Sequence, residues 1–200
     1  TIIYLHGCSG IWSGTHARMD AFQRSGFAVI APVSLARNKY PQSCDPVKKV
    51  GGFYRSVLKM RQFDALHAIR EARKLNWVDP DNIFLVGFSE GAIVSATLSA
   101  ESDQPLRARV VEGWTCHAGW SEYRGLNSTI NEPVLTLVAK GDPWFQNYWT
   151  KGDCTEFINK EDGSRSVVYD QGLLRYKHSL LDSRVVQELV ISFLQAHLVE

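Results

Sequence analysis

Apolar and amphipathic segments alternate along the chain, and this alternation predicts strands and helices in turn. Short apolar runs predict strands at 2–6, 27–32, 83–86, 108–113, 134–139 and 166–169. Apolar residues at helical spacing and helix-end signals predict helices at about 15–25, 53–76, 91–100 and 182–198. Strands that alternate with helices favour a mostly parallel central sheet with helices on both faces. We therefore expect an α/β chain in which residues 1–200 form a single domain.

Two segments depart from this alternation. Residues 33–52 contain two prolines, a glycine pair and few large apolar side chains, so we expect a long loop there. The chain also starts abruptly, because Thr1-Ile-Ile-Tyr-Leu5 has the pattern of a buried strand without a polar lead-in. We expect that the natural protein has sequence upstream of Thr1 that was trimmed, processed or left out.

Charge and hydropathy narrow the range of partners. Lys and Arg total 22 against 21 Asp and Glu, which gives a formal net charge of +1. Such a balance offers no electrostatic argument for nucleic acid or an anionic membrane as a partner. No apolar run approaches the roughly 18 residues that a membrane-spanning helix needs. We therefore expect neither a nucleic-acid partner nor a membrane span; the motifs described below favour a small-molecule partner.

A serine in a glycine-bearing turn is the strongest chemical signal. Gly87-Phe88-Ser89-Glu90-Gly91 joins an apolar strand to a predicted helix. This is the context of a G-x-S-x-G turn, in which a sharp strand-to-helix junction lifts a serine hydroxyl above the sheet edge. The glycines leave room for neighbouring backbone. We predict that Ser89 is a nucleophile.

A serine hydroxyl attacks only when a base removes its proton, and that base needs an orienting acid. Asp142 directly follows the apolar strand at 134–139, and His178 follows the strand at 166–169. Both should therefore reach the same sheet edge as Ser89, in the order serine, acid, histidine. Asp153 and Asp170 are weaker candidates for the acid because neither directly follows an apolar strand. His117 comes too early in the chain and is expected to lie in the core or to line a pocket.

Negative charge that develops on a carbonyl oxygen needs two backbone donors. The N–H of Glu90, directly after the nucleophile, should be one donor. The loop Leu5-His6-Gly7-Cys8-Ser9-Gly10 should supply the other, most simply the N–H of Cys8, because Gly7 lets this loop turn tightly. His6 is expected to brace the loop by hydrogen bonding.

These motifs resemble those of the dienelactone hydrolase family within the α/β-hydrolases. The matches are LHGCSG at 5–10, GFSEG at 87–91, GDPWF at 141–145 and RYKHSL at 175–180, and the similarity spans nearly the whole chain. The resemblance implies an α/β-hydrolase fold that lacks the family's first strands. It also implies hydrolysis of a carboxylic ester or lactone through an acyl-enzyme on Ser89. Dienelactone hydrolases use a cysteine nucleophile, so Ser89 favours a serine esterase-like relative.

The same residues are compatible with several other functions. A thioesterase, a peptidase or a perhydrolase would use the same three residues, and a non-catalytic binding domain could share the fold. The histidines and cysteines are scattered rather than clustered at ligand spacing, so we expect no metal and no organic cofactor.

Substrate contacts follow from residues near the expected sheet edge. Aromatic side chains gather there and favour an apolar or aromatic pocket: Trp12, Trp114, Trp120, Trp144, Phe145, Tyr148 and Trp149. Arg37, Tyr40 and Arg175 could bind a substrate carboxylate or be ordinary surface residues. The carboxylate of Glu90 is expected to pair with Arg37 or Arg175.

Four cysteines without C-x-x-C spacing leave two possibilities. They either remain free thiols in a cytoplasmic enzyme or form two disulfides, which would favour a periplasmic or secreted location. Cys8 and Cys44 both belong to loops expected near the catalytic edge, which makes them one candidate pair. Cys116 and Cys154 form the other.

Overall fold

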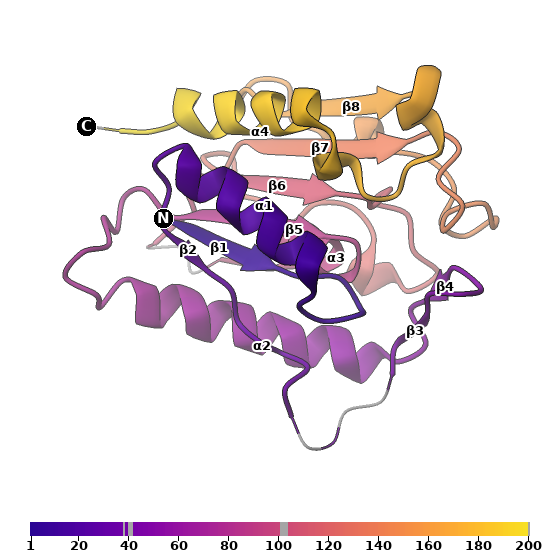
Figure 1. Ribbon diagram of the computed structural model, residues 1–200, viewed down its shortest axis with the longest axis horizontal. Coiled ribbons are helices and arrows are strands. Elements are labelled where there is room, and N and C mark those ends of the chain that lie inside the picture. Colours follow the sequence, from indigo (N-terminus) through magenta and orange to yellow (C-terminus); the bar gives the residue numbers. More distant parts are fainter. Residues whose placement is uncertain (38, 40–41, 101–103, 200) are drawn as a thin grey trace.

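The computed structural model describes residues 1–37, 39, 42–100 and 104–199. A parallel six-stranded sheet lies at its centre, in the order β2-β1-β5-β6-β7-β8 (Figure 1). The strands are β1 (Ile2–Leu5), β2 (Val29–Ile30), β5 (Phe84–Phe88), β6 (Ala108–Glu112), β7 (Val134–Ala139) and β8 (Arg165–Tyr169). Because the strands are parallel, their carboxyl ends all meet at one edge of the sheet.

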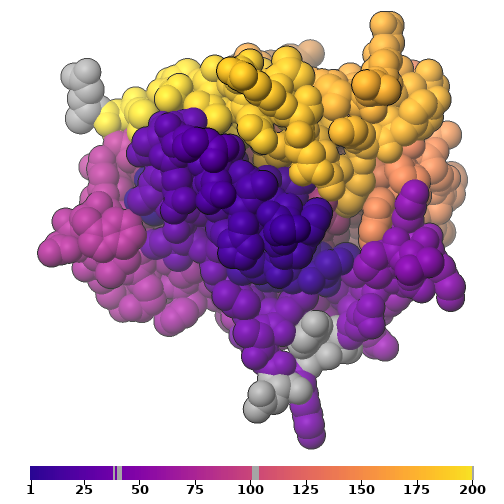
Figure 2. All heavy atoms as spheres, in the orientation of Figure 1, coloured from indigo at the N-terminus to yellow at the C-terminus, as the bar shows by residue number. Residues whose placement is uncertain are grey.

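Helices cover both faces of the sheet. They are α1 (Ser13–Arg24), α2 (Arg55–Ala72), α3 (Glu90–Thr97) and α4 (Arg184–Ala196). Apolar residues of α1 and α4 share one core cluster with the sheet, and those of α2 and α3 share another. Figure 2 shows α1 (indigo) and α4 (yellow) side by side on the same surface of the protein. The predicted α/β arrangement is therefore confirmed.

Alternate residues of one strand supply the two cores, as the pleat requires. Ile2 and Tyr4 of β1 pack on the side of α1 and α4, whereas Ile3 and Leu5 pack on the side of α2 and α3. All four side chains are buried. Complete burial of a large apolar side chain contributes roughly 1.5–3 kcal/mol, so the apolar run that predicted this strand also anchors it.

The loop prediction for 33–52 was wrong in part. Two short antiparallel strands, β3 (Cys44–Asp45) and β4 (Val50–Gly51), form a separate hairpin there. Each has only two residues, too few for an alternating pattern to appear in the sequence. The predicted strand at 27–32 is also shorter, because only Val29 and Ile30 pair with β1 at the edge of the sheet.

The longest predicted helix, 53–76, is trimmed at both ends. The N–H of Phe53 donates to the carbonyl of Ser43 (3.2 Å), which keeps that residue outside α2. After Ala72 the chain tightens into a turn in which the N–H of Leu75 donates to the carbonyl of Ala72 (3.1 Å). Short 3-10 helices occur at Ser121–Tyr123, Thr155–Phe157, Gly172–Tyr176 and Leu180–Asp182.

The four cysteines form two disulfides. Cys8 is bonded to Cys44, and Cys116 is bonded to Cys154, which are the two pairs that the sequence suggested. None of the described helices is long and apolar enough to cross a membrane. Within the same described ranges, no group of three or more His, Cys, Asp or Glu side chains is arranged to hold a metal ion.

Candidate active site

Ser89 lies at the junction between β5 and α3, with φ of 55° and ψ of −118°. A positive φ is uncommon for a residue with a side chain and persists only when the surroundings enforce it. Here the N–H of Ser89 donates to the carbonyl of Glu112 on the neighbouring strand β6 (2.8 Å). The strained backbone therefore presents the serine at the carboxyl edge of the sheet.

Two glycines make this turn possible. A Cβ atom on Gly87 would lie 2.2 Å from the carbonyl oxygen of Gly91, and a Cβ atom on Gly91 would lie 2.1 Å from the carbonyl oxygen of Leu5. Both obstacles are backbone atoms, so neither can move aside without displacing β1 or α3. The G-x-S-x-G spacing is thus a steric requirement of the close approach between these elements.

Of the three side chains selected from the sequence, His178 lies within hydrogen-bonding distance of both Ser89 and Asp142. Nε2 of His178 is 2.8 Å from Oγ of Ser89, and Nδ1 is 2.7 Å from Oδ2 of Asp142. An ionised carboxylate can only accept a hydrogen bond, so Nδ1 carries the proton and Nε2 is free to accept from the serine. Asp142 follows β7, and His178 follows β8 and the 3-10 helix at Gly172–Tyr176.

Asp142 is held rigidly in its loop. Its side chain is 1% exposed, and its second carboxylate oxygen, Oδ1, accepts the N–H of Trp144 (3.0 Å). Its backbone N–H donates to the carbonyl of Ala139 (3.0 Å) at the end of β7. One carboxylate oxygen is therefore fixed by the loop, and the other faces the imidazole of His178.

Aromatic rings hold the imidazole of His178 from several sides. Trp144 stacks on it with centroids 5.2 Å apart, and Phe88 and Phe145 contact it at 5.1 and 5.6 Å. Gly113, at a φ of 68°, lies so close that a Cβ atom there would be 3.2 Å from Cε1 of the ring. This packing leaves the His178 side chain 12% exposed.

Glu112 is a buried carboxylate beneath the site that the sequence reasoning missed. It ends β6, accepts a hydrogen bond from Arg18 (3.2 Å) and another from the N–H of Leu181 (2.7 Å). Burial raises the pKa of Glu112, and the nearby Arg18 guanidinium opposes that rise. Its backbone carbonyl fixes Ser89, so the residue supports the serine turn from below.

The loop after β1 runs directly against the serine. A Cβ atom on Gly7 would lie 3.5 Å from Cβ of Ser89, and the next residue, Cys8, lines the same cavity as Ser89. The N–H of Glu90 opens the first turn of α3, where no carbonyl one turn earlier is available to it. Cys8 and Glu90, the residues predicted to supply the two donors, both line the same cavity as Ser89.

His6 braces this loop. The ring is fully buried, and its Nδ1 lies 2.7 Å from the carbonyl oxygen of Gly7. Burial, together with the positive charge of Arg61, lowers the pKa of His6 to about 4. The ring is therefore neutral at physiological pH, with Nδ1 as the donor to Gly7.

A cavity of about 400 Å³ opens beside Ser89. Its walls are mainly apolar and aromatic and include the Cys8–Cys44 disulfide. Five of the seven aromatic residues expected here line it: Trp114, Trp120, Trp144, Phe145 and Trp149. The cavity can therefore receive an apolar or aromatic group of a bound molecule.

The charged contacts expected from the sequence are placed differently. Arg37 pairs with Asp64 of α2 and does not line the cavity. Arg175 is exposed, with its guanidinium 5.3 Å from the ring centroid of Tyr176, and also lies outside the cavity lining. Tyr40 falls outside the described residues.

The expected partner of Glu90 was wrong. Its Oε1 accepts a hydrogen bond from Arg61 of α2 (2.7 Å), and its Oε2 accepts one from the hydroxyl of Ser43. Arg61 was missed because arginines on predicted helices usually face solvent. One signal could have found it: position 61 stands three residues after Leu58 and four before Ala65, on the apolar face of the helix.

The remaining candidates lie apart from the serine. Nε2 of His117 is 3.2 Å from the carbonyl oxygen of Asp153, so this half-buried histidine braces the loop next to Cys154 rather than the cavity. The Asp153 carboxylate accepts the N–H of Thr155 (2.8 Å), and Asp170 is exposed. The described contacts of His178 thus single out Asp142 among the three acids.

Comparison with known proteins finds no matching family model and no matching curated sequence. Solved structures do match. A structure described as a hydrolase of the alpha/beta superfamily, from Xanthomonas campestris pv. campestris, has a TM-score of 0.60 at 18% identity, covering 98% of this chain and 96% of the other. Est1E from Butyrivibrio proteoclasticus matches with a TM-score of 0.62 at 14% identity, covering 98% of this chain and 87% of the other. The esterase Pf2001 from Pyrococcus furiosus matches with a TM-score of 0.58 at 16% identity, covering 98% of this chain and 82% of the other.

These similarities extend over almost the full length of the chain, and the parallel direction of the six strands agrees with the mostly parallel sheet expected from the sequence. At identities below 20%, this structural similarity shows a shared architecture but does not by itself transfer an activity. The chain has the α/β-hydrolase fold.

Proposed function

We propose that this protein is a serine hydrolase that cleaves a carboxylic ester or lactone, with Ser89 as nucleophile, His178 as base and Asp142 as orienting acid. The observation that carries the proposal is the imidazole of His178, which bridges the serine hydroxyl and the buried carboxylate at 2.8 and 2.7 Å. The strained backbone of Ser89 adds support, because such strain is common at catalytic residues.

In the first half of the reaction, Nε2 of His178 takes the proton of Ser89 as Oγ bonds to the carbonyl carbon. The oxyanion is bound by the N–H groups of Cys8 and Glu90, and Asp142 stabilises the charged imidazole. The imidazolium then gives its proton to the leaving alcohol as the carbon–oxygen bond breaks. In a lactone the alcohol stays tethered to the acyl group.

In the second half, water attacks the acyl-enzyme, and His178 accepts one of its protons. Collapse of the second tetrahedral intermediate breaks the bond to Oγ and returns that proton to Ser89. The products are a carboxylic acid and the free enzyme. Each step uses only the three side chains, the two backbone donors and water.

The cavity favours an uncharged ester with an apolar or aromatic part. Its lining is mainly apolar, and the carboxylate of Glu90 is already engaged by Arg61 and Ser43. Among the structures with this fold, Est1E has also been solved with ferulic acid, an aromatic acid, bound to it. Membership in a dienelactone hydrolase-like family belongs to this proposal and is supported by the quoted motifs, with Ser89 in place of the family's cysteine.

A substrate panel with Ser89→Ala as control tests the proposal. The panel contains p-nitrophenyl esters of increasing acyl length, an aryl ester, a lactone and an acyl thioester. We expect ester or lactone turnover by the wild type and a loss of about 10³- to 10⁶-fold in Ser89→Ala.

Ser95→Ala is the matched control, because Ser95 lies on the same helix and its hydroxyl bonds only to backbone carbonyls in the described contacts. It should retain turnover. Full esterase activity in Ser89→Ala would refute the proposal, and a strong preference for the thioester would redirect it to thioester hydrolysis.

A further inference from the structure

Arg61 connects the two segments that supply the proposed oxyanion donors. It projects from α2 and is 2% exposed. One terminal nitrogen donates to the carboxylate of Glu90 (2.7 Å), and the other donates to the backbone carbonyl of His6. Glu90 carries one proposed donor N–H, and His6 lies two residues before Cys8, which carries the other. A single buried guanidinium therefore bridges both sides of the oxyanion site.

The dipeptide Ser43–Cys44 makes a second connection between the same two segments. The hydroxyl of Ser43 donates to the other carboxylate oxygen of Glu90, and Cys44 forms the disulfide with Cys8. Both residues are buried, and Cys44 is the first residue of the β3–β4 hairpin. The loop after β1 and the first turn of α3 are thus tied together twice, once through Arg61 and once through this dipeptide.

We propose that Arg61 is a positioning residue for the reaction: by binding Glu90 and the His6 carbonyl together, it sets the separation between the N–H groups of Cys8 and Glu90. This inference rests on the proposed function. Oxyanion donors act only within about 2.7–3.1 Å of the developing charge. A shift of about 1 Å can lower the rate by about 100-fold, so a link that fixes this separation should act on kcat.

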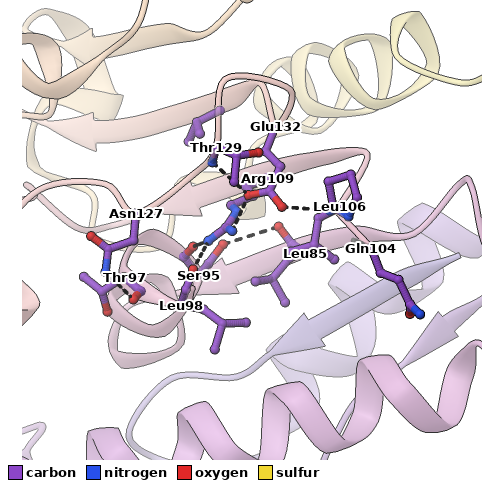
Figure 3. A network of polar contacts seen from close by, with 12 residues as sticks. Leu85, Ser95, Thr97, Leu98, Gln104, Leu106, Arg109, Asn127, Thr129 and Glu132 are labelled. Atoms are coloured by element: carbon purple, nitrogen blue, oxygen red, sulfur yellow. Dashed lines mark hydrogen bonds and ion pairs between the residues drawn. The ribbon is translucent and has the colours of Figure 1, made fainter. Parts of the chain in front are cut away.

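A purely structural ion pair in the same protein provides the contrast. Arg109 and Glu132 are fully buried and form an ion pair (Figure 3). Arg109 also donates to the carbonyls of Ser95 and Leu98, while Glu132 accepts the N–H of Leu106 (2.8 Å). These groups lie at the far end of α3 from Ser89. Loss of this pair should lower stability without altering the oxyanion site.

The test compares Arg61→Met, Arg61→Lys and the double variant Arg61→Met/Glu90→Gln with Arg109→Met/Glu132→Gln. The first double variant removes both charges, so it avoids leaving a buried carboxylate unpaired. For each protein, kcat and KM are measured on the best p-nitrophenyl ester, well below the melting temperature of that protein. Inhibition by an arylboronic acid, which mimics the tetrahedral intermediate, is measured beside inhibition by the product acid.

We expect both Arg61→Met proteins to lose about 10- to 100-fold in kcat, with KM changed by less than about twofold. Affinity for the boronic acid should fall in parallel, while affinity for the product acid stays constant. Arg61→Lys should recover part of kcat, because an ammonium can replace one of the two hydrogen bonds. The Arg109→Met/Glu132→Gln control should melt at a lower temperature with kcat within about twofold of the wild type.

A folded Arg61→Met/Glu90→Gln protein with wild-type kcat and boronic acid affinity would overturn the positioning role. A loss confined to the melting temperature would do the same. If Arg61→Met alone does not fold, the double variant and Arg61→Lys decide the question. Failure of the proposed function looks different, since it would appear as an inactive wild type or as a fully active Ser89→Ala protein.

Discussion

Replacing His6 with asparagine should make the stability of this protein less sensitive to acid. The His6 ring is fully buried in the loop after β1, and its Nδ1 donates to the carbonyl of Gly7 at 2.7 Å. Burial and the neighbouring Arg61 guanidinium lower its pKa from 6.5 to about 4. Asparagine keeps a short polar side chain in the loop and cannot take up a proton.

The direction of the effect follows from proton binding in the two states. Above pH 6.5 the ring is neutral whether the chain is folded or unfolded, so the full stability is present. As the pH falls from 6.5 to about 4, His6 takes up a proton in the unfolded chain but not in the folded one. Stability is therefore lost across this window. At about 1.4 kcal/mol per pH unit, the total loss is about 3 kcal/mol.

Guanidinium unfolding at pH 7, 5.5 and 4.5, followed by tryptophan fluorescence without reductant, measures this loss. Because other groups also titrate, the relevant quantity is the difference between the wild type and His6→Asn at each pH. We expect this difference to change by about 2–3 kcal/mol between pH 7 and pH 4.5 in favour of the variant.

His67→Asn serves as the control, because His67 is an exposed histidine on α2. Its free energy of unfolding should follow the wild-type pH profile. If His6→Asn also keeps the wild-type profile between pH 7 and 4.5, then the folded ring is protonated near its ordinary pKa, and the assignment of His6 as a neutral brace is refuted.

Two further predictions test the site and the turn that carries it. Asp142→Asn should lower kcat by about 10⁴-fold, because an amide can no longer hold Nδ1–H of His178 as a carboxylate does; steady-state ester hydrolysis measures the loss, and kcat within tenfold of the wild type would contradict the role of Asp142. Gly91→Ala should reduce the free energy of unfolding by about 1–3 kcal/mol or more, because the new Cβ would lie 2.1 Å from the carbonyl oxygen of Leu5. Denaturant unfolding checks this against Gly119→Ala, whose Cβ would make only ordinary contacts at 3.8 Å or more; equal stability of the two variants would show that β1 and α3 do not approach as described.

The amino-acid pattern was enough to predict the order of the elements along the chain and the residues of the candidate site. Alternating apolar and amphipathic segments predict a parallel sheet, and the carboxyl ends of parallel strands meet at one edge. Ser89, Asp142 and His178 each follow their own apolar strand, so local pattern alone was enough to bring them together. The role of Gly87 and Gly91 could also be predicted, because steric crowding at a sharp turn excludes residues with a side chain.

The partners of the charged side chains could not be predicted from the sequence. The sequence suggested Arg37 or Arg175 for Glu90, whereas the structure pairs Glu90 with Arg61 and pairs Arg37 with Asp64. An arginine or glutamate can reach many positions, and its partner depends on how α2 packs against the serine turn. Sequence spacing does not encode that geometry.

The hairpin around Cys44 shows the same limit. Each of its strands has two residues, and it is tied to the rest of the protein through the Cys8–Cys44 disulfide and the hydrogen bond from Ser43 to Glu90. Strands of two residues are too short for residue propensities to predict them. The hairpin's place beside the oxyanion site is set by contacts between residues far apart in the chain, and for that physical reason only the folded structure revealed it.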